Sequence, residues 1–114
     1  MKKLIALFTL IIILTACGPA EPEPISISLK ALDIAWETPD LTAAAGQTIT
    51  LEVINTGVLD HTFTIEELAL DLEVSPDESI EITFMVSELG TYDFICTTAG
   101  HAEAGMVGTL TITP

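Results

Sequence analysis

The chain has 114 residues, 49% of them hydrophobic, and a formal net charge of −14. A length of this order allows one domain, which excludes a multi-domain enzyme, and two cysteines are too few for a scaffold held by several disulfides. Seventeen acidic residues against three lysines also exclude binding to a nucleic-acid backbone, because phosphate groups are bound by cationic side chains.

The first predicted element is a signal peptide over residues 1–16. Two lysines supply its positive start, and the apolar run over 4–14 is shorter than the roughly 20 residues that span a bilayer as a helix. The sequence Leu-Thr-Ala-Cys at 14–17 resembles a bacterial lipobox, which implies cleavage before Cys17 and attachment of a diacylglyceryl group to its thiol. The alternative is an ordinary secretory signal with an incidental cysteine. We expect a lipid-anchored, extracytoplasmic protein, on the outer face of the cytoplasmic membrane or in the periplasm.

Residues 17–24 are predicted to form a tether between the lipid and a domain over 25–114. Three prolines and two glutamates in this stretch favour extended polyproline II, which at about 3.1 Å per residue reaches roughly 20 Å. Removal of the signal leaves Lys30 as the single basic residue among all seventeen acids. So negative a chain is repelled by anionic lipid and favours a basic partner.

The domain shows the two-residue alternation of β-strands and little helical periodicity. Ile49, Leu51 and Val53, for example, share one face. Residues 66–72 alone favour a helical turn. The alternation, with turn residues between the runs, predicts an all-β fold, an antiparallel sandwich of two sheets. The predicted strands lie at 25–29, 47–55, 61–65, 80–86, 92–96 and 107–113.

Side chains that bind soft metals are scarce after the signal, which makes their placement informative. Cys96, His101 and Met106 lie in one short run with the spacing Cys-x4-His-x4-Met, and His61 lies on an earlier predicted strand. Two imidazoles and one thiolate with a weak axial thioether make a blue-copper site, and zinc is the main competing metal. Four protein ligands leave no open position for a substrate, so we expect an electron carrier and not an enzyme.

This motif, with Gly100 before the second histidine and Ala-Gly at 104–105 before the methionine, resembles that of the cupredoxins, in particular the auracyanin, azurin and plastocyanin-type groups. The resemblance covers residues 25–112. It implies a Greek-key antiparallel β-sandwich of about seven to eight strands and one type 1 copper ion. By this resemblance the copper ligands are His61, Cys96, His101 and, in the axial position, Met106.

Some residues near the motif match the family pattern, and others depart from it. Tyr92 matches a tyrosine whose hydroxyl ties a loop to the sandwich. Thr62 replaces the asparagine that commonly follows the first histidine. We expect its hydroxyl to pair with Thr97 and so to orient the ligand loop. Asn55 is also expected to lie near the ligands. Ala99 replaces a common proline, and its N–H is predicted to point at the cysteine sulfur and to raise the reduction potential.

The predicted function is one-electron transport between redox partners by Cu(I)/Cu(II) cycling. The expected partners are a cytochrome, a membrane electron-transfer complex or a terminal oxidase, and the carrier is expected to be a monomer. Small side chains around His101, Ala102 among them, leave the imidazole edge near a flat apolar patch where a partner can dock transiently. Two alternatives stay open: a copper chaperone or storage lipoprotein, and a metal-free β-sandwich module.

Overall fold

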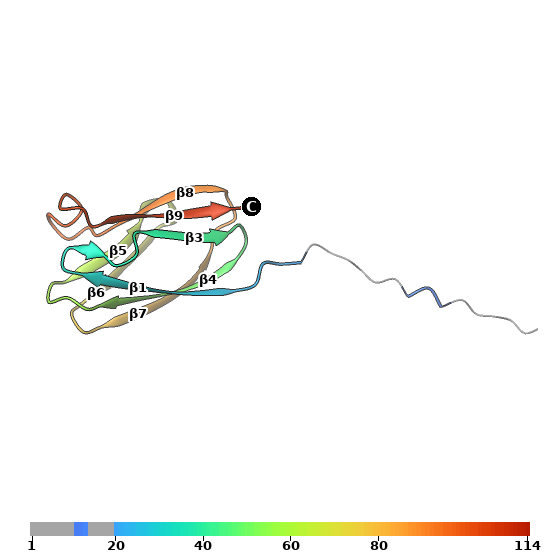
Figure 1. The fold of residues 1–114 in the computed structure, drawn as a ribbon, viewed down its shortest axis with the longest axis horizontal. Coiled ribbons are helices and arrows are strands. Elements are labelled where there is room, and N and C mark those ends of the chain that lie inside the picture. Colours follow the sequence, from blue (N-terminus) through green and yellow to red (C-terminus); the bar gives the residue numbers. More distant parts are fainter. Residues whose placement is uncertain (1–10, 14–19) are drawn as a thin grey trace, which may run out of the picture.

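The computed structural model describes residues 11–13 and 20–114. Cys17 and most of the predicted signal lie outside these residues, and the first strand starts at Ile25 (Figure 1). Within the described ranges, no helix has the length and hydropathy needed to cross a membrane.

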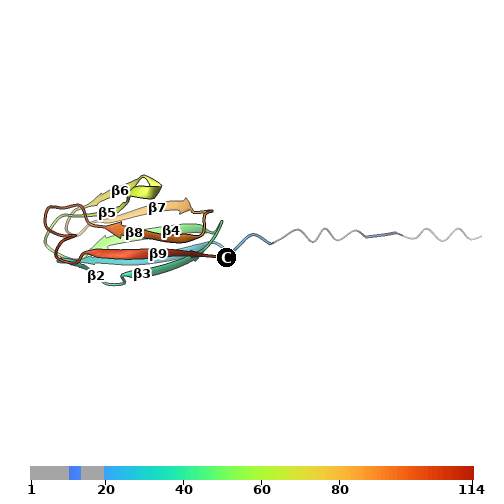
Figure 2. The same cartoon turned by 90° about the horizontal axis from the view of Figure 1, so that it is seen from above.

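Two β-sheets pack face to face and make up the domain (Figure 1 and Figure 2). Their strands, with one 3₁₀ turn η1, are β1 (Ile25–Leu32), β2 (Ala35–Trp36), β3 (Asp40–Ala44), β4 (Thr48–Asn55), β5 (His61–Ile65), η1 (Glu66–Leu68), β6 (Leu70–Val74), β7 (Ser79–Met85), β8 (Gly90–Ile95) and β9 (Val107–Thr113). The strand order is β2-β1-β4-β7 in the four-stranded sheet and β3-β9-β8-β5-β6 in the five-stranded sheet.

The predicted all-β sandwich is confirmed, with two differences in its sheets. Two strand pairs are parallel, β1 with β4 and β3 with β9, so the prediction of a purely antiparallel sandwich is wrong for these pairs. The chain leaves β1, forms β3 in the other sheet and returns as β4, which therefore runs in the direction of β1. The described residues form nine strands, close to the seven to eight that the resemblance implies. The sequence pattern predicts six of them and misses β2, β3 and β6.

The helical turn predicted over 66–72 is present only in its first part. η1 ends at Leu68, because the next residue, Ala69, has a φ of 52° in the left-handed region. From Leu70 onward the chain forms β6, which pairs antiparallel with β5 and begins with the pair Ile65 and Leu70. Backbone pairing with a neighbouring strand outweighs the weak helical preference of this segment.

The core between the sheets is built from alternating side chains. Ile49, Leu51 and Val53, predicted to share an inward face, are 1%, 1% and 0% exposed. Each such buried aliphatic side chain contributes about 1.5–3 kcal/mol relative to an exposed one. This burial fixes the register of β4, because a slip by one residue would turn all three side chains to the solvent.

Three aromatic rings form a cluster within this core. Trp36 packs edge-on against Phe63 and Phe94, with ring centroids 5.8 and 5.6 Å apart. Phe63 comes two residues after His61, and Phe94 comes two residues before Cys96. Alternate residues of a strand share a face, so His61 and Cys96 point to the same side as Phe63 and Phe94. The packing of the aromatic cluster therefore also holds the backbone positions from which His61 and Cys96 point inward.

The sandwich has two poles, which we name by their distance from the N-terminal segment. β1 and β4 run side by side from one pole to the other. The proximal pole comprises Ile25 and the loops 45–47 and 86–89. The distal pole comprises the turn 33–34 and the loops 55–60 and 96–106, on the left of Figure 1.

Candidate metal centre

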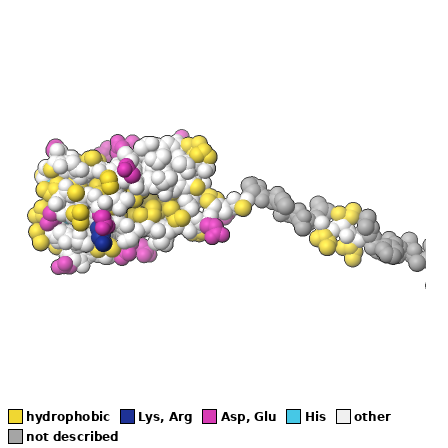
Figure 3. Space-filling model, in the orientation of Figure 1, with side chains coloured by type: hydrophobic (Ala, Val, Ile, Leu, Met, Phe, Trp, Pro, Cys, Tyr) yellow, Lys and Arg dark blue, Asp and Glu magenta, His cyan; other side chains and the backbone are white. Residues whose placement is uncertain are grey.

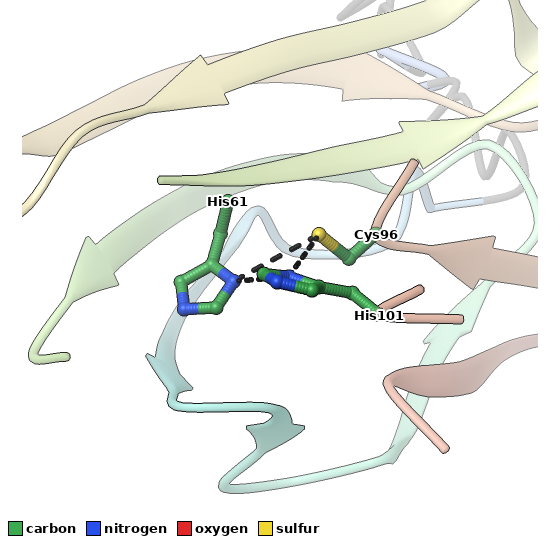
Figure 4. A group of neighbouring side chains, drawn as sticks. All are labelled: His61, Cys96 and His101. Carbon is green, nitrogen blue, oxygen red and sulfur yellow. Dashed lines mark hydrogen bonds between the residues drawn. The ribbon is translucent and has the colours of Figure 1, made fainter. Parts of the chain in front are cut away.

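Three of the four predicted ligands converge at the distal pole. His61 is the first residue of β5, Cys96 directly follows β8, and His101 lies in the loop before β9. The two Nδ1 atoms are 3.2 Å apart, and the Cys96 sulfur lies 3.4 Å from Nδ1 of His101 and 3.8 Å from Nδ1 of His61 (Figure 4). The three residues are 1%, 0% and 7% exposed. Each directs one donor atom into a common buried space.

Met106, the predicted axial ligand, is tied to two of these residues through the backbone. The N–H of Cys96 donates to the Met106 carbonyl at 3.1 Å, and the N–H of Met106 donates to the His101 carbonyl at 3.0 Å. Its side chain is completely buried. Met85, by contrast, is 58% exposed at the end of β7. Of the two methionines after the signal, Met106 therefore lies at the distal pole with the other proposed ligands, and Met85 does not.

The loop 96–106 is compact because it is built from consecutive turns. The N–H of His101 donates to the Thr98 carbonyl at 3.0 Å, and Gly100 at the third position of this turn has a φ of 82°. These features describe a type II turn, in which the third position favours glycine and the second often holds proline. Ala99 occupies that second position. The turn places His101 across from Cys96.

The surroundings of Cys96 favour the thiolate form of its side chain. Burial raises the pKa of its thiol, but hydrogen bonds from Thr98, Thr62 and His61 together outweigh it and lower the pKa from 9.0 to about 6. The Thr62 N–H lies 3.4 Å from the sulfur. The thiolate is the form that binds a metal, so near neutral pH no proton has to be displaced from this ligand.

The hydrogen bond predicted between Thr62 and Thr97 is present. Their hydroxyl oxygens are 2.8 Å apart, and the Thr97 N–H donates to the Thr62 hydroxyl at 2.7 Å. These bonds join the start of β5 to the residue after Cys96. The hydrogen bond predicted from Ala99 is not found: among the described residues, the backbone N–H groups that act on the sulfur are those of Thr62, at 3.4 Å, and Thr98.

Asn55, which we placed near the site, braces the loop that leads to His61. Its side-chain amide donates to the carbonyls of Leu59 at 2.7 Å and Val74 at 2.9 Å, and its side-chain oxygen accepts from the Gly57 N–H at 3.0 Å. The side chain is 1% exposed, so all these bonds are shielded from water. Asn55 therefore acts on the loop 55–60 and not directly on the ligands.

Tyr92 also behaves as expected, because its hydroxyl donates to the Glu88 carbonyl at 3.0 Å. This bond ties the loop 86–89 to β8 at the proximal pole.

One residue of the site, Asp33, is missing from the sequence prediction. Its carboxylate lies 3.1 Å from Nε2 of His61 and accepts the N–H groups of Val58 at 2.8 Å and Leu59 at 3.3 Å. The Val58 N–H is the main cause that holds the pKa of Asp33 below its usual value. Asp33 stands in the turn between β1 and β2, which the sequence pattern does not predict, and no spacing motif links it to His61.

The donor separations fit one metal ion. Nitrogen and sulfur ligands bind such ions at about 2.0–2.3 Å, so three of them in a plane around one ion lie about 3.5–4 Å apart. The observed separations of 3.2, 3.4 and 3.8 Å lie close to these values, the two shorter ones slightly below them. A thioether beside two imidazoles and a thiolate is typical of blue-copper sites and is not a usual zinc ligand. The donor set therefore fits copper.

A comparison with protein families agrees with this chemistry. The model of the Cupredoxin-like domain matches residues 3–112. This chain belongs to the cupredoxin-like family. Auracyanin-B of Chloroflexus aurantiacus is 47% identical over 51 residues, which are 45% of this cupredoxin and 22% of that protein. The chain therefore spans well under half of the length of this relative.

Solved auracyanin structures share the fold. Reduced auracyanin of Roseiflexus castenholzii has a TM-score of 0.71 and 25% identity, covering 85% of this cupredoxin and all of that chain. Auracyanin B has a TM-score of 0.69 and 23% identity, covering 85% and 93%. Auracyanin A, described as a "blue" copper protein of C. aurantiacus, has a TM-score of 0.68 and 24% identity, covering 79% and 99%. The implied cupredoxin fold is confirmed.

Proposed function

We propose that this cupredoxin carries single electrons on one copper ion held by His61, Cys96 and His101, with Met106 as the axial ligand. The observation that supports this most strongly is the convergence of three buried donor atoms that lie 3.2 to 3.8 Å apart. Thiolate and thioether suit Cu(I), and imidazole suits both oxidation states. Ligands held by strands and a tight loop need little rearrangement when the charge of the ion changes.

The burial of the donors argues against the two alternatives. A chaperone that hands copper on presents accessible ligands, whereas the four proposed ligands here are at most 7% exposed. A metal-free module would bury two imidazoles and a thiol together without a function for them, at a cost in desolvation. Four protein ligands also leave no open coordination position, so the site suits electron transfer and not catalysis.

Copper binding and redox cycling are tested on the purified, processed chain. Adding Cu(II) to the apoprotein should produce an intense visible band, which ascorbate bleaches and reoxidation restores with the copper retained. Cys96→Ser should lose the band. Met85→Leu, which removes the exposed methionine of the proximal pole, is the matched control and should keep it. A colourless wild-type sample would refute copper binding, and release of Cu(I) on reduction would support a chaperone.

We further propose that lipid at Cys17 anchors the domain and that 17–24 is its tether. The start of β1 at the proximal pole and the ligands at the distal pole support this arrangement. A domain tethered through Ile25 directs its metal pole away from the lipid, towards partners in the extracytoplasmic space. Cell fractionation tests the anchor: wild type should sediment with membranes, and Cys17→Ser should not. Equal partition of the two would contradict the anchor.

A redox partner is proposed to dock at the distal pole. His101 is the most exposed of the four ligands at 7%, and Val58 and Leu59 in the neighbouring loop are 81% and 40% exposed. Figure 3 shows hydrophobic side chains at this pole, on the left, and acidic side chains scattered over the visible face. An apolar contact surrounded by dispersed negative charge suits a small, transient interface with a basic cytochrome, membrane complex or oxidase.

A further inference from the structure

The carboxylate of Asp33 occupies a prepared position on the outer side of His61. Nδ1 of His61 faces Cys96 and His101 (Figure 4). Nε2, on the opposite side of the ring, lies 3.1 Å from Oδ1 of Asp33. The histidine side chain is fully buried, and the aspartate side chain is 30% exposed. The two nitrogens of one imidazole thus have separate tasks, one facing the donor cluster and the other a carboxylate.

The loop 55–60 is shaped around this carboxylate. The N–H groups of Val58 and Leu59 both donate to Asp33, at 2.8 and 3.3 Å. At Gly57 a Cβ atom would overlap the Asp33 carboxylate, so only glycine leaves this carboxylate in its observed position. Asn55 in turn accepts the Gly57 N–H at 3.0 Å. The loop therefore supplies two donors and an open space to one side chain from a distant turn.

We propose that Asp33 is a positioning residue that holds the proton of His61 on Nε2 and thereby keeps the lone pair of Nδ1 free for the metal, and that its negative charge favours Cu(II) over Cu(I). The inference rests on the proposed copper site. An imidazole that binds a metal through one nitrogen commonly donates its other N–H to a carboxylate, which fixes the tautomer and the ring orientation. A nearby negative charge stabilises a doubly charged ion more than a singly charged one.

The tautomer is tested without any metal. In the apoprotein at about pH 8, the ring ¹⁵N shifts of His61 should report a proton on Nε2. In Asp33→Ala the two tautomers should become mixed, while Asp33→Asn, whose side-chain oxygen still accepts, should keep the wild-type tautomer. A proton on Nδ1 in the wild type, or an unchanged tautomer in Asp33→Ala, would overturn the proposal. This result does not depend on whether copper binds.

The second test measures copper affinity and the reduction potential of the copper-loaded chain. Asp33→Ala should bind copper about 10- to 100-fold more weakly, as is typical when a ligand loses its hydrogen-bonding partner. Asp33→Asn should shift the potential upward. Asp60→Asn removes the same charge from an exposed side chain at the same pole and is the matched control, with a smaller shift. Equal shifts in the two variants would refute a specific role for Asp33.

Gly57→Ala provides a variant that leaves the charge unchanged. The added Cβ displaces the carboxylate from its position, so copper affinity should fall as in Asp33→Ala. Gly46→Ala at the proximal pole is the control: it adds the same methyl group, strains a backbone with a φ of 74° and contacts nothing near the metal site. An unchanged copper affinity in Gly57→Ala would contradict the proposal. A wild type that binds no copper at all would refute the proposed function, but it would not affect the tautomer measurement.

Discussion

The two poles of the sandwich differ in the kind of side chain that each one buries. The distal pole buries polar groups: Asn55, His61 and His101 are 1%, 1% and 7% exposed. Exposed apolar side chains occur at both poles: Met85 and Leu89 at the proximal pole are both 58% exposed, and Val58 at the distal pole is 81% exposed. Burying a polar group costs free energy unless it has a partner, whereas single exposed apolar residues are common on protein surfaces. The buried polar groups therefore mark the functional end more clearly than the exposed apolar ones do.

A change in the aromatic cluster should give the largest contrast with the proximal pole. Phe63→Ala removes a side chain that is 1% exposed and packs against Trp36 and Phe94, so the free energy of unfolding should fall by about 3–5 kcal/mol. Leu89→Ala at the proximal pole should change it by less than about 0.5 kcal/mol. Urea unfolding of both apoproteins, followed by Trp36 fluorescence, checks this. Equal losses of unfolding free energy in the two variants would show that the aromatic cluster contributes no more to stability than Leu89 does.

The stability of the apoprotein should depend on pH through Cys96. Its pKa is about 6 in the fold against an ordinary 9.0, so between these values the folded state holds fewer protons than the unfolded state. The free energy of unfolding should therefore rise with pH across this window, by an amount on the order of a few kcal/mol, and the gain is lost as the pH falls through about 6. Urea unfolding at several pH values measures it. Cys96→Ser should remove this rise, and a rise that persists in it would point to another group.

A negative charge beside His101 should slow electron exchange without removing copper. Ala102→Glu places a like charge where two molecules must approach, which costs on the order of 1 kcal/mol and slows electron self-exchange about fivefold. The same substitution at the other pole, Leu89→Glu, is the control and should leave the rate nearly unchanged. NMR line broadening in mixtures of the oxidised and reduced protein gives both rates. Similar slowing in both variants would mean that overall charge, and not the distal pole, controls the encounter.

The smallest effect is expected at Ala99. Proline is favoured at the second position of a type II turn, and the backbone N–H groups that act on the sulfur are those of Thr62 and Thr98 and not that of Ala99. Ala99→Pro should therefore raise the free energy of unfolding by about 0.4–1 kcal/mol and leave the reduction potential unchanged. Calorimetry and voltammetry measure the two quantities. A lower potential in this variant would restore the original hypothesis that the Ala99 N–H acts on the sulfur.

The amino-acid sequence by itself determined the all-β class and the candidate ligands. The alternation at Ile49, Leu51 and Val53 is a local property of the chain, and one buried face is enough to specify a strand. The motif from Cys96 to Met106 lies within one loop, so its spacing can be read directly. The Thr62 to Thr97 bond was also predictable, because each residue directly follows a proposed ligand.

Only the tertiary structure decided how distant segments serve the site. The crossing of the chain to β3 makes β1 and β4 parallel. The packing of the two sheets brings Asp33, in the turn between β1 and β2, to His61 of the other sheet, 28 residues away. The source of the N–H group at the sulfur, Thr62 and not Ala99, likewise depends on how β5 lies against β8. Such contacts join residues that share no local pattern, because their proximity comes from the packing of the sheets and the path of the chain between them.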